Sequence, residues 1–185
     1  GRCFNDPRRV CATGASGGGI CVKGGSFTTH GGEGSDGAAT GSKGRGGGLD
    51  VIGNTATISH STIADNTATG YGGGAYLGTN TVEMSNSTIS GNVALDIAGL
   101  EMNVNGGTID SSTITRNQST FVAFYNFSGA RTFGITTVPS TIISGNFGAG
   151  THVYDWFPSV NTTDANNMAG TLGGVATPTG LVGTT

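Results

Sequence analysis

The sequence is poor in charged residues, and this excludes several classes of function. Charged residues make up 10% of the 185 residues, and the formal net charge is −3. A nucleic-acid footprint or a polybasic membrane-surface segment needs clustered positive charge, so neither nucleic acid nor an anionic lipid surface is a predicted partner. No run approaches the ~18 apolar residues of a membrane-spanning helix, so no membrane span is expected.

Cysteine is also scarce, and it is confined to one end of the chain. The three cysteines are Cys3, Cys11 and Cys21. One disulfide closing a short loop would suit a secreted protein and leave one thiol over, and the spacing does not say which two pair. No matching histidine spacing accompanies them, so the sequence predicts no zinc site and no cofactor. Calcium binding stays open, because calcium needs only oxygen ligands.

Glycine, by contrast, is abundant and takes part in a repeat. The chain has 36 glycines, about 19%, against a typical ~7%. Residues 46–51 (GGGLDV) return as 72–77 (GGGAYL) and more loosely as 98–102 (AGLEM). A second motif keeps step with the first, at 61–66 (STIADN), 87–92 (STISGN) and 112–117 (STITRN). A period of this length predicts stacked supersecondary units.

Each unit carries three short runs typical of β-strands. In the second unit they are residues 75–77, 81–85 and 87–89, with period-two alternation and turns of Gly, Asn and Ser between them. The pattern predicts an all-β fold, a single-stranded parallel β-helix whose coils of 25–26 residues stack at ~4.8 Å.

Aligning the units predicts which side chains point inward. The apolar columns alternate with polar ones, as expected when one face of each strand is buried. A column of asparagines falls at a turn, where stacked amides can form a hydrogen-bonded ladder. The inward columns are Ile20, Leu49, Ala75, Leu100; Val22, Val51, Leu77, Met102; Ile58, Met84, Ile109; and Ile63, Ile89, Ile114; the ladder is Asn66, Asn92, Asn117, Asn146.

The ends of the repeat define three parts of the chain. Residues 1–16 are predicted to form an N-terminal cap, 17–160 the β-helix, and 161–185 a degenerate coil or cap. Residues 30–45 contain almost no apolar side chain and are predicted to be an exposed loop. Residues 140–146 (STIISGN) supply one more coil, aligned 28 residues after Ser112.

The motifs carry a family resemblance. The Gly-Gly-Gly-Leu/Ala starts and Thr-Ile-x-x-Asn ends resemble repeats of the right-handed parallel β-helix (pectin-lyase-like) superfamily. They are particularly similar to polymorphic outer-membrane proteins and autotransporter passengers, although Ile63, Ile89 and Ile114 stand where that type often has Phe. The resemblance implies a secreted or surface-exposed solenoid. It specifies fold more than activity, because β-helices include lyases, hydrolases and adhesins.

One outward column suggests catalysis. Asp50 and Glu101 are two coils apart, roughly 9–10 Å, with Tyr76 between them. Inverting glycosidases hold an acid and a base ~6.5–9.5 Å apart, with room for the attacking water. The first hypothesis is therefore a secreted β-helix that acts on, or at least binds, polysaccharide along its strand flank, with Asp50 and Glu101 as the acid–base pair if it hydrolyses it. Candidate substrate contacts are Tyr76, Glu83, Tyr125 and Trp156. The simpler interpretation is that these are solvated polar residues on an outward face.

Two other functions fit the same solenoid. One is a monomeric, non-enzymatic passenger or adhesin-like module that contacts a cell-surface glycan. The other is ice binding by an outward threonine column, Thr62, Thr88, Thr113 and Thr141. Nine aromatic residues between 121 and 158 are predicted to close the end of the core, with Tyr125, Tyr154 and Trp156 as members that could reach solvent and stack on sugars. The histidines, His30, His60 and His152, are scattered along the chain.

Overall fold

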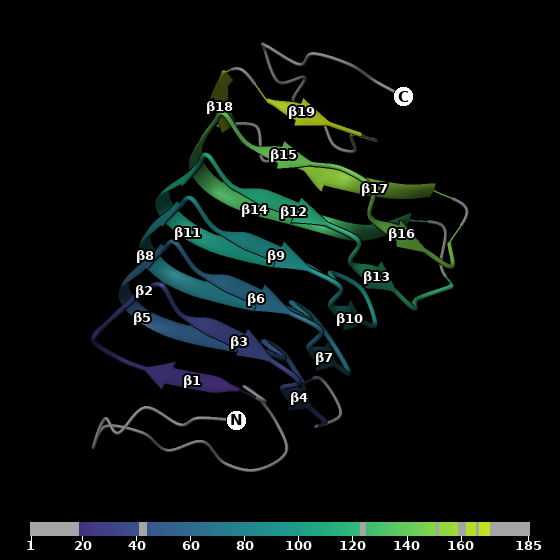
Figure 1. The fold of residues 1–185 in the computed structure, drawn as a ribbon, viewed down its shortest axis with the longest axis horizontal. Coiled ribbons are helices and arrows are strands. Elements are labelled where there is room, and N and C mark those ends of the chain that lie inside the picture. Colours follow the sequence, from purple (N-terminus) through teal and green to yellow (C-terminus); the bar gives the residue numbers. More distant parts are fainter. Residues whose placement is uncertain are drawn as a thin grey trace.

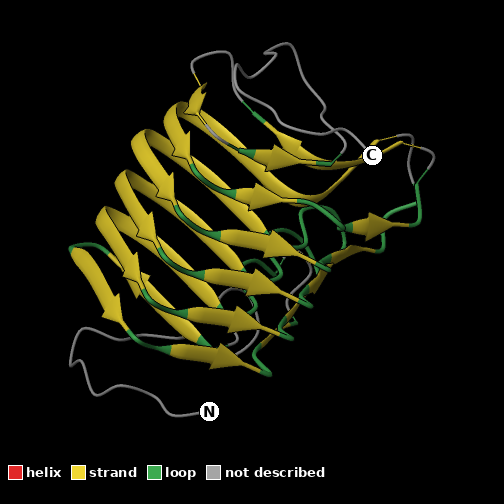
Figure 2. Cartoon of the chain, turned by 45° about the horizontal axis from the view of Figure 1, so that its top comes forward, coloured by secondary structure: helices red, strands yellow, loops and turns green. Residues whose placement is uncertain are grey.

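The chain winds into a stack of flat coils with no helix among the residues that the structure describes (Figures 1 and 2). The computed structural model describes residues 19–40, 44–122, 125–150, 152–158, 162–165 and 167–170. The coils follow one another from the N-terminal end to the C-terminal end along a single axis (Figure 1). The described residues contain no helix that is long and apolar enough to cross a membrane.

Three parallel sheets form the sides of the stack. The long sheet contains β1 (Ile20–Lys23), β5 (Leu49–Ser59), β8 (Ala75–Ser85), β11 (Leu100–Asp110), β14 (Tyr125–Pro139) and β17 (His152–Phe157), with β2 (Ser26–His30) beside β5 and β18 (Thr162–Ala165) beside β14. The middle sheet contains β3 (Glu33–Ser35), β6 (Thr62–Ala64), β9 (Thr88–Ser90), β12 (Thr113–Thr115), β15 (Ile142–Ile143) and β19 (Met168–Ala169). The short sheet contains β4 (Ala38–Ala39), β7 (Thr67–Ala68), β10 (Val93–Ala94), β13 (Gln118–Ser119) and β16 (Phe147–Gly148).

The register confirms the predicted β-helix. Leu49 pairs with Ala75 and Ala75 with Leu100, which are separations of 26 and 25 residues. The coils at either end are longer, since Ile20 pairs with Leu49 and Leu100 with Ala130. One detail differs: the runs 75–77 and 81–85 belong to a single strand of 11 residues, β8. The backbone pairing continues across most of the bend that separates the two runs.

The interior is built from the predicted apolar columns. Their members from Leu49 to Ile114 are buried and form one cluster. Side-chain volumes are also matched within a coil: Gly107 occupies an inward position of β11, and a Cβ there would lie 2.7 Å from the Cε of Met102 in the same strand. The flexible Met102 side chain thus fills the space that the glycine leaves. Such stacking makes each coil depend on its two neighbours for burial.

The asparagine ladder is also confirmed. Asn66 donates from both its backbone N–H and its Nδ2 to Asn92 Oδ1, each at 2.9 Å. The same pair of bonds links Asn92 to Asn117 and Asn117 to Asn146. The last amide donates instead to a carboxylate, Asp155 Oδ1, at 2.7 and 2.8 Å. The four amides are buried, so each satisfied bond avoids the cost of an unpaired polar group.

The predicted exposed loop over residues 30–45 is wrong in part. Residues 33–35 and 38–39 are β3 and β4, which pair with β6 and β7 as the second and third sides of the first coil. Their inward positions carry Gly34 and Ala39, and residues this small do not produce a recognisable apolar pattern in the sequence. Backbone hydrogen bonds to the next coil hold the segment, for example from Thr67 N–H to the Gly37 carbonyl at 2.8 Å. Residues 41–43 are not described.

The fourth coil of the asparagine ladder, which contains Asn146, is shifted by one residue from its predicted alignment. Ile142 pairs with Thr113 and Ile143 with Ile114, so the spacing is 29 residues. Thr141 is buried, and its Oγ1 accepts the Ser112 N–H at 3.4 Å. The outward column therefore continues from Thr113 to the exposed Ile142, not to Thr141. Both frames suit the Ser-Thr-Ile-Ile sequence, and the ladder contact at Asn146 selects the longer one.

The two ends of the chain are described unequally. The N-terminal cap predicted over residues 1–16 lies outside the described residues, as do Cys3 and Cys11; Cys21 is buried in β1. At the other end, β18 and β19 extend the long and middle sheets beyond residue 160.

Candidate functional site

The outer face of the long sheet carries a polar and aromatic column, which we call the flank. It runs through one position of each successive strand: Cys21, Asp50, Tyr76, Glu101, Arg131 and Phe157. The prediction that its two acids are solvated is wrong, since Asp50 is 0% and Glu101 6% exposed. Segments returning to the long sheet from the short sheet place other side chains against them, and alternation along a strand cannot reveal this.

The first half of the flank is organised by an arginine. Arg45 Nε lies 3.6 Å from Asp50 Oδ2, and its guanidinium carbon lies 4.5 Å from the centre of the Tyr76 ring. Gly78 makes room for that ring, because a Cβ there would be 3.0 Å from Tyr76 Cε1. Arg45 is only partly buried, and on the aromatic face it gains a cation–π interaction as well as its ion pair. The contact with Arg45 and the space left by Gly78 together fix the orientation of the Tyr76 ring.

Beside Tyr76 the flank opens into a shallow pocket at the bend of the long sheet. The three exposed amides in its wall come from two neighbouring strands, and Asn105 Nδ2 donates to Asn80 Oδ1 at 3.1 Å. The pocket is lined by Arg45, Ile52, Gly53, Tyr76, Gly78, Thr79, Asn80, Asn103, Val104 and Asn105. An aromatic ring, a guanidinium and planar amides around an open hollow are groups that can bind a polar, ring-shaped ligand.

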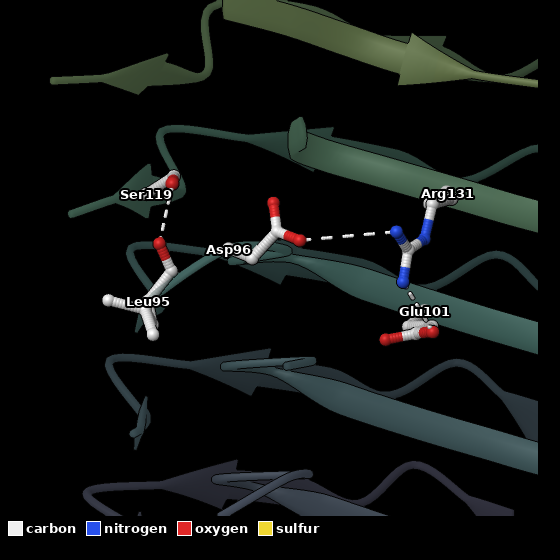
Figure 3. A network of polar contacts seen from close by, with 5 residues as sticks. All are labelled: Leu95, Asp96, Glu101, Ser119 and Arg131. Carbon is white, nitrogen blue, oxygen red and sulfur yellow. Dashed lines mark hydrogen bonds and ion pairs between the residues drawn. The ribbon is translucent and has the colours of Figure 1, made fainter. Parts of the chain in front are cut away.

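A second arginine organises the other half of the flank (Figure 3). Arg131 Nη2 donates to Glu101 Oε1 at 2.8 Å, and Nη1 lies 3.9 Å from Asp96 Oδ2. Aromatic rings enclose this guanidinium, with ring centres 4.9–5.8 Å from its carbon: Tyr71, Phe127 and Phe133. The segment that carries Asp96 is tied down next to it, because Ser119 Oγ donates to the Leu95 carbonyl at 2.9 Å (Figure 3).

The Arg131 cluster holds two carboxyl groups for one cation. Burial raises the pKa of Asp96 above its ordinary value, and the negative charge of Glu101 raises it further, while Arg131 and the Phe127 backbone N–H act in the opposite direction. Asp96 Oδ1 and Glu101 Oε2 are buried and have no hydrogen-bond partner among the described residues. The folded protein therefore takes up a proton at Asp96 more readily than the unfolded chain does.

This shift predicts how Asp96→Asn changes stability with pH. A raised pKa contributes stability that is fully present below the ordinary aspartate value of about 3.9 and is lost as pH rises through the folded value. The stability of wild type relative to Asp96→Asn should thus fall between pH 4 and pH 7. Urea denaturation of both proteins at the two pH values measures this, and a difference that stays constant or grows would contradict it.

A comparison with protein families identifies the fold. The model of the right-handed β-helix region matches residues 12–168. The chain belongs to the right-handed β-helix family. No match was found among curated proteins or among solved structures. Membership gives this β-helix its handedness and supports the coil architecture, but assigns it no substrate and no catalytic residue.

The β-helix places the other predicted site residues in different environments. Asp50 and Glu101 are two strands apart with Tyr76 between them, as the repeat predicts. Glu83 is exposed on the outer face of β8. Trp156 is fully buried over the core, so its predicted exposure is wrong; it pairs with Ala130 at an inward position. Tyr125 lies in β14, paired with His152, and its side chain is not described.

Sequence reasoning missed the residues that surround the two acids. Arg45, Tyr71 and Asp96 precede Leu49, Ala75 and Leu100 by four positions each, so they form a second column facing the flank. The constant spacing of four residues before the inward column could have revealed this second column, although the residues at these positions differ in type. No group of three or more His, Cys, Asp or Glu suited to a metal occurs in the described part of the chain.

Proposed function

We propose that this β-helix is a secreted or cell-surface protein that binds polysaccharide along its flank. The observation that carries the proposal is the pocket beside Tyr76, where a half-buried aromatic ring held by Arg45 meets the amides of Asn80, Asn103 and Asn105. Sugars present apolar ring faces together with hydroxyl groups, so a fixed aromatic ring and amide donors and acceptors suit them.

The geometry of the flank favours a long ligand over a single sugar. Its positions repeat at ~4.8 Å because they belong to adjacent paired strands. From the pocket the column passes through Glu101 to Arg131, where Tyr71 and Phe133 are 36% and 38% exposed. Polar and aromatic groups therefore line up across several coils. The strands that carry them are rigid, which limits the entropy lost on binding.

Binding is better supported than hydrolysis. Asp50 and Glu101 are the candidate acid and base, yet each is buried and each faces an arginine. Each carboxyl group is already the partner of a guanidinium, whereas a general acid or base must contact the substrate or its attacking water. Hydrolysis by this pair would also require a route for the sugar to two side chains that solvent barely reaches.

The likeness of the repeats to autotransporter passengers supports a non-enzymatic role at a cell surface, in which glycan binding would amount to adhesion. Ice binding is less favoured. The outward column of the middle sheet that contains Thr62, Thr88 and Thr113 begins at Glu33 and continues to Ile142. A charged side chain at one end and a large apolar one at the other thus limit the threonine row to three coils.

Affinity electrophoresis through a panel of polysaccharides tests the binding proposal. Tyr76→Ala is expected to weaken binding of the retarding glycan about tenfold or more, corresponding to ~1.4 kcal/mol. Thr88→Ala is the matched control, because Thr88 lies on the outer face of the middle sheet. Equal retardation of wild type and Tyr76→Ala, or no retardation of the folded wild type by any glycan, would contradict the proposal.

Release of reducing ends from the same panel separates binding from hydrolysis. We expect no release. Release that disappears in both Asp50→Asn and Glu101→Gln, with folding intact by circular dichroism, would instead establish the acid–base pair. Release that survives both substitutions would place catalysis elsewhere in the chain.

A further inference from the structure

We propose that His30 and His60 form a binding site for a divalent transition-metal ion, with Ni²⁺ and Cu²⁺ as the best-suited ions. The site lies at the corner between the long and middle sheets: His30 ends β2, and His60 follows β5. It is independent of the proposed glycan-binding flank.

The winding of the chain brings together two histidines that are 30 residues apart in sequence. His30 pairs with Ser59 across the β2–β5 ladder, so the next residue, His60, stands beside it. The two ring centres are 4.7 Å apart, and the planes are inclined by 54°. Both side chains are exposed, so solvent and dissolved ions reach them. Two imidazoles this close can act on one ion, which neither could hold well alone.

The hydrogen bonds around Ser59 indicate which ring nitrogen of His30 is available. Ser59 Oγ donates to the Thr29 carbonyl at 3.4 Å, and it also lies 3.0 Å from His30 Nδ1. The contact with Ser59 occupies Nδ1, so Nε2 is the ring nitrogen that can face an ion, and metal binding would select the tautomer with its proton on Nδ1. The lone pair is then on Nε2. Donation of the other ring N–H to a neighbouring group is the arrangement that orients a metal-binding histidine.

The stack fixes the backbone that carries the second imidazole. His60 has a φ of 50°, and its N–H donates to the Ser85 carbonyl of the next coil at 3.1 Å. The equivalent corners of the following coils, Asn86, Ser111 and Ser140, also have positive φ. The left-handed turn is therefore a property of the stack, and the backbone keeps the two histidines side by side whether or not an ion is bound.

Imidazole nitrogens select borderline ions such as Ni²⁺, Cu²⁺ and Zn²⁺ over Ca²⁺ or Mg²⁺. The described residues offer no third His, Cys, Asp or Glu for a larger ligand set here. Water would fill the remaining coordination positions, so the ion would exchange readily.

Proton NMR of the tag-free protein with sub-stoichiometric Ni²⁺ tests the site residue by residue. The chain has three histidines, so three imidazole Hε1 signals report on three places. Paramagnetic Ni²⁺ should broaden those of His30 and His60 together, while that of His152 in β17 stays sharp. His152→Gln identifies the third signal and serves as the control, and it should leave the broadening unchanged.

The chain itself supplies variants that preserve the fold. His30→Ser introduces the residue found at the same position in the next coil, Ser59, and His60→Asn introduces that of the next corner, Asn86. Either change should raise the Ni²⁺ concentration needed to broaden the remaining histidine by about tenfold or more, because the second ligand no longer acts at high effective concentration. Equal broadening of all three histidines, or an unchanged midpoint in both variants, would overturn the proposal.

Discussion

Replacing Asn92 by aspartate is expected to lower the free energy of unfolding by about 3–5 kcal/mol, the usual cost of an uncompensated buried charge. Asn92 is fully buried, and its Nδ2 donates to Asn117 Oδ1 at 2.9 Å and to the Ile63 carbonyl at 3.0 Å. Aspartate has nearly the same shape but would direct an acceptor at these acceptors. The change therefore isolates the hydrogen bonds of the ladder from its packing.

Urea denaturation measures this effect, with Asn54→Asp as the control. Asn54 is an exposed asparagine on the outer face of β5, where the same change of charge should alter stability by no more than about 0.5 kcal/mol. A loss at Asn92 no greater than that at Asn54 would show that the ladder amides do not stabilise the stack.

Arg131→Met should destabilise the fold by about 3 kcal/mol, at the lower end of the range for a broken buried ion pair because the side chain is partly exposed. The substitution keeps an unbranched chain among Tyr71, Phe127 and Phe133, but it leaves Glu101 without its partner. The loss thus comes from the unpaired carboxylate more than from packing.

A double-mutant cycle with Glu101→Gln distinguishes these two sources. If the unpaired charge dominates, adding Glu101→Gln to Arg131→Met should restore much of the lost stability, and the coupling free energy should exceed ~1 kcal/mol. Additive losses in the two single variants would mean that Arg131 acts through its aromatic contacts alone.

Much of the fold follows from the sequence because stacked coils repeat the same physical constraints. Ile63, Ile89 and Ile114 occupy equivalent positions, so one alignment of the units predicts all three inward side chains. The ladder is predictable for the same reason. The alignment fails where a coil changes length: residues 140–146 contain two adjacent isoleucines, and the ladder contact at Asn146 and the pairing of Ile143 with Ile114 select the longer frame.

The candidate site was harder to predict, because it depends on contacts between segments of one coil. Alternation correctly places Asp50 and Glu101 outside the core, but an outward position is not always a solvated one. Arg45 and Asp96 approach from the segments that return to the long sheet. The equivalent position of the coil between them carries Tyr71, so the residue type is not repeated. The pairing of His30 with His60 likewise required the register of the coils.

The bond between Asn146 and Asp155 gives the ladder a defined end. An asparagine side chain accepts hydrogen bonds from one neighbour and donates to the next. A row of asparagines can therefore always be extended by another coil. A carboxylate accepts hydrogen bonds but has no N–H to donate to a further coil. Asp155 therefore ends the row of amides by satisfying its last member, while β18 and β19 carry the long and middle sheets one step further.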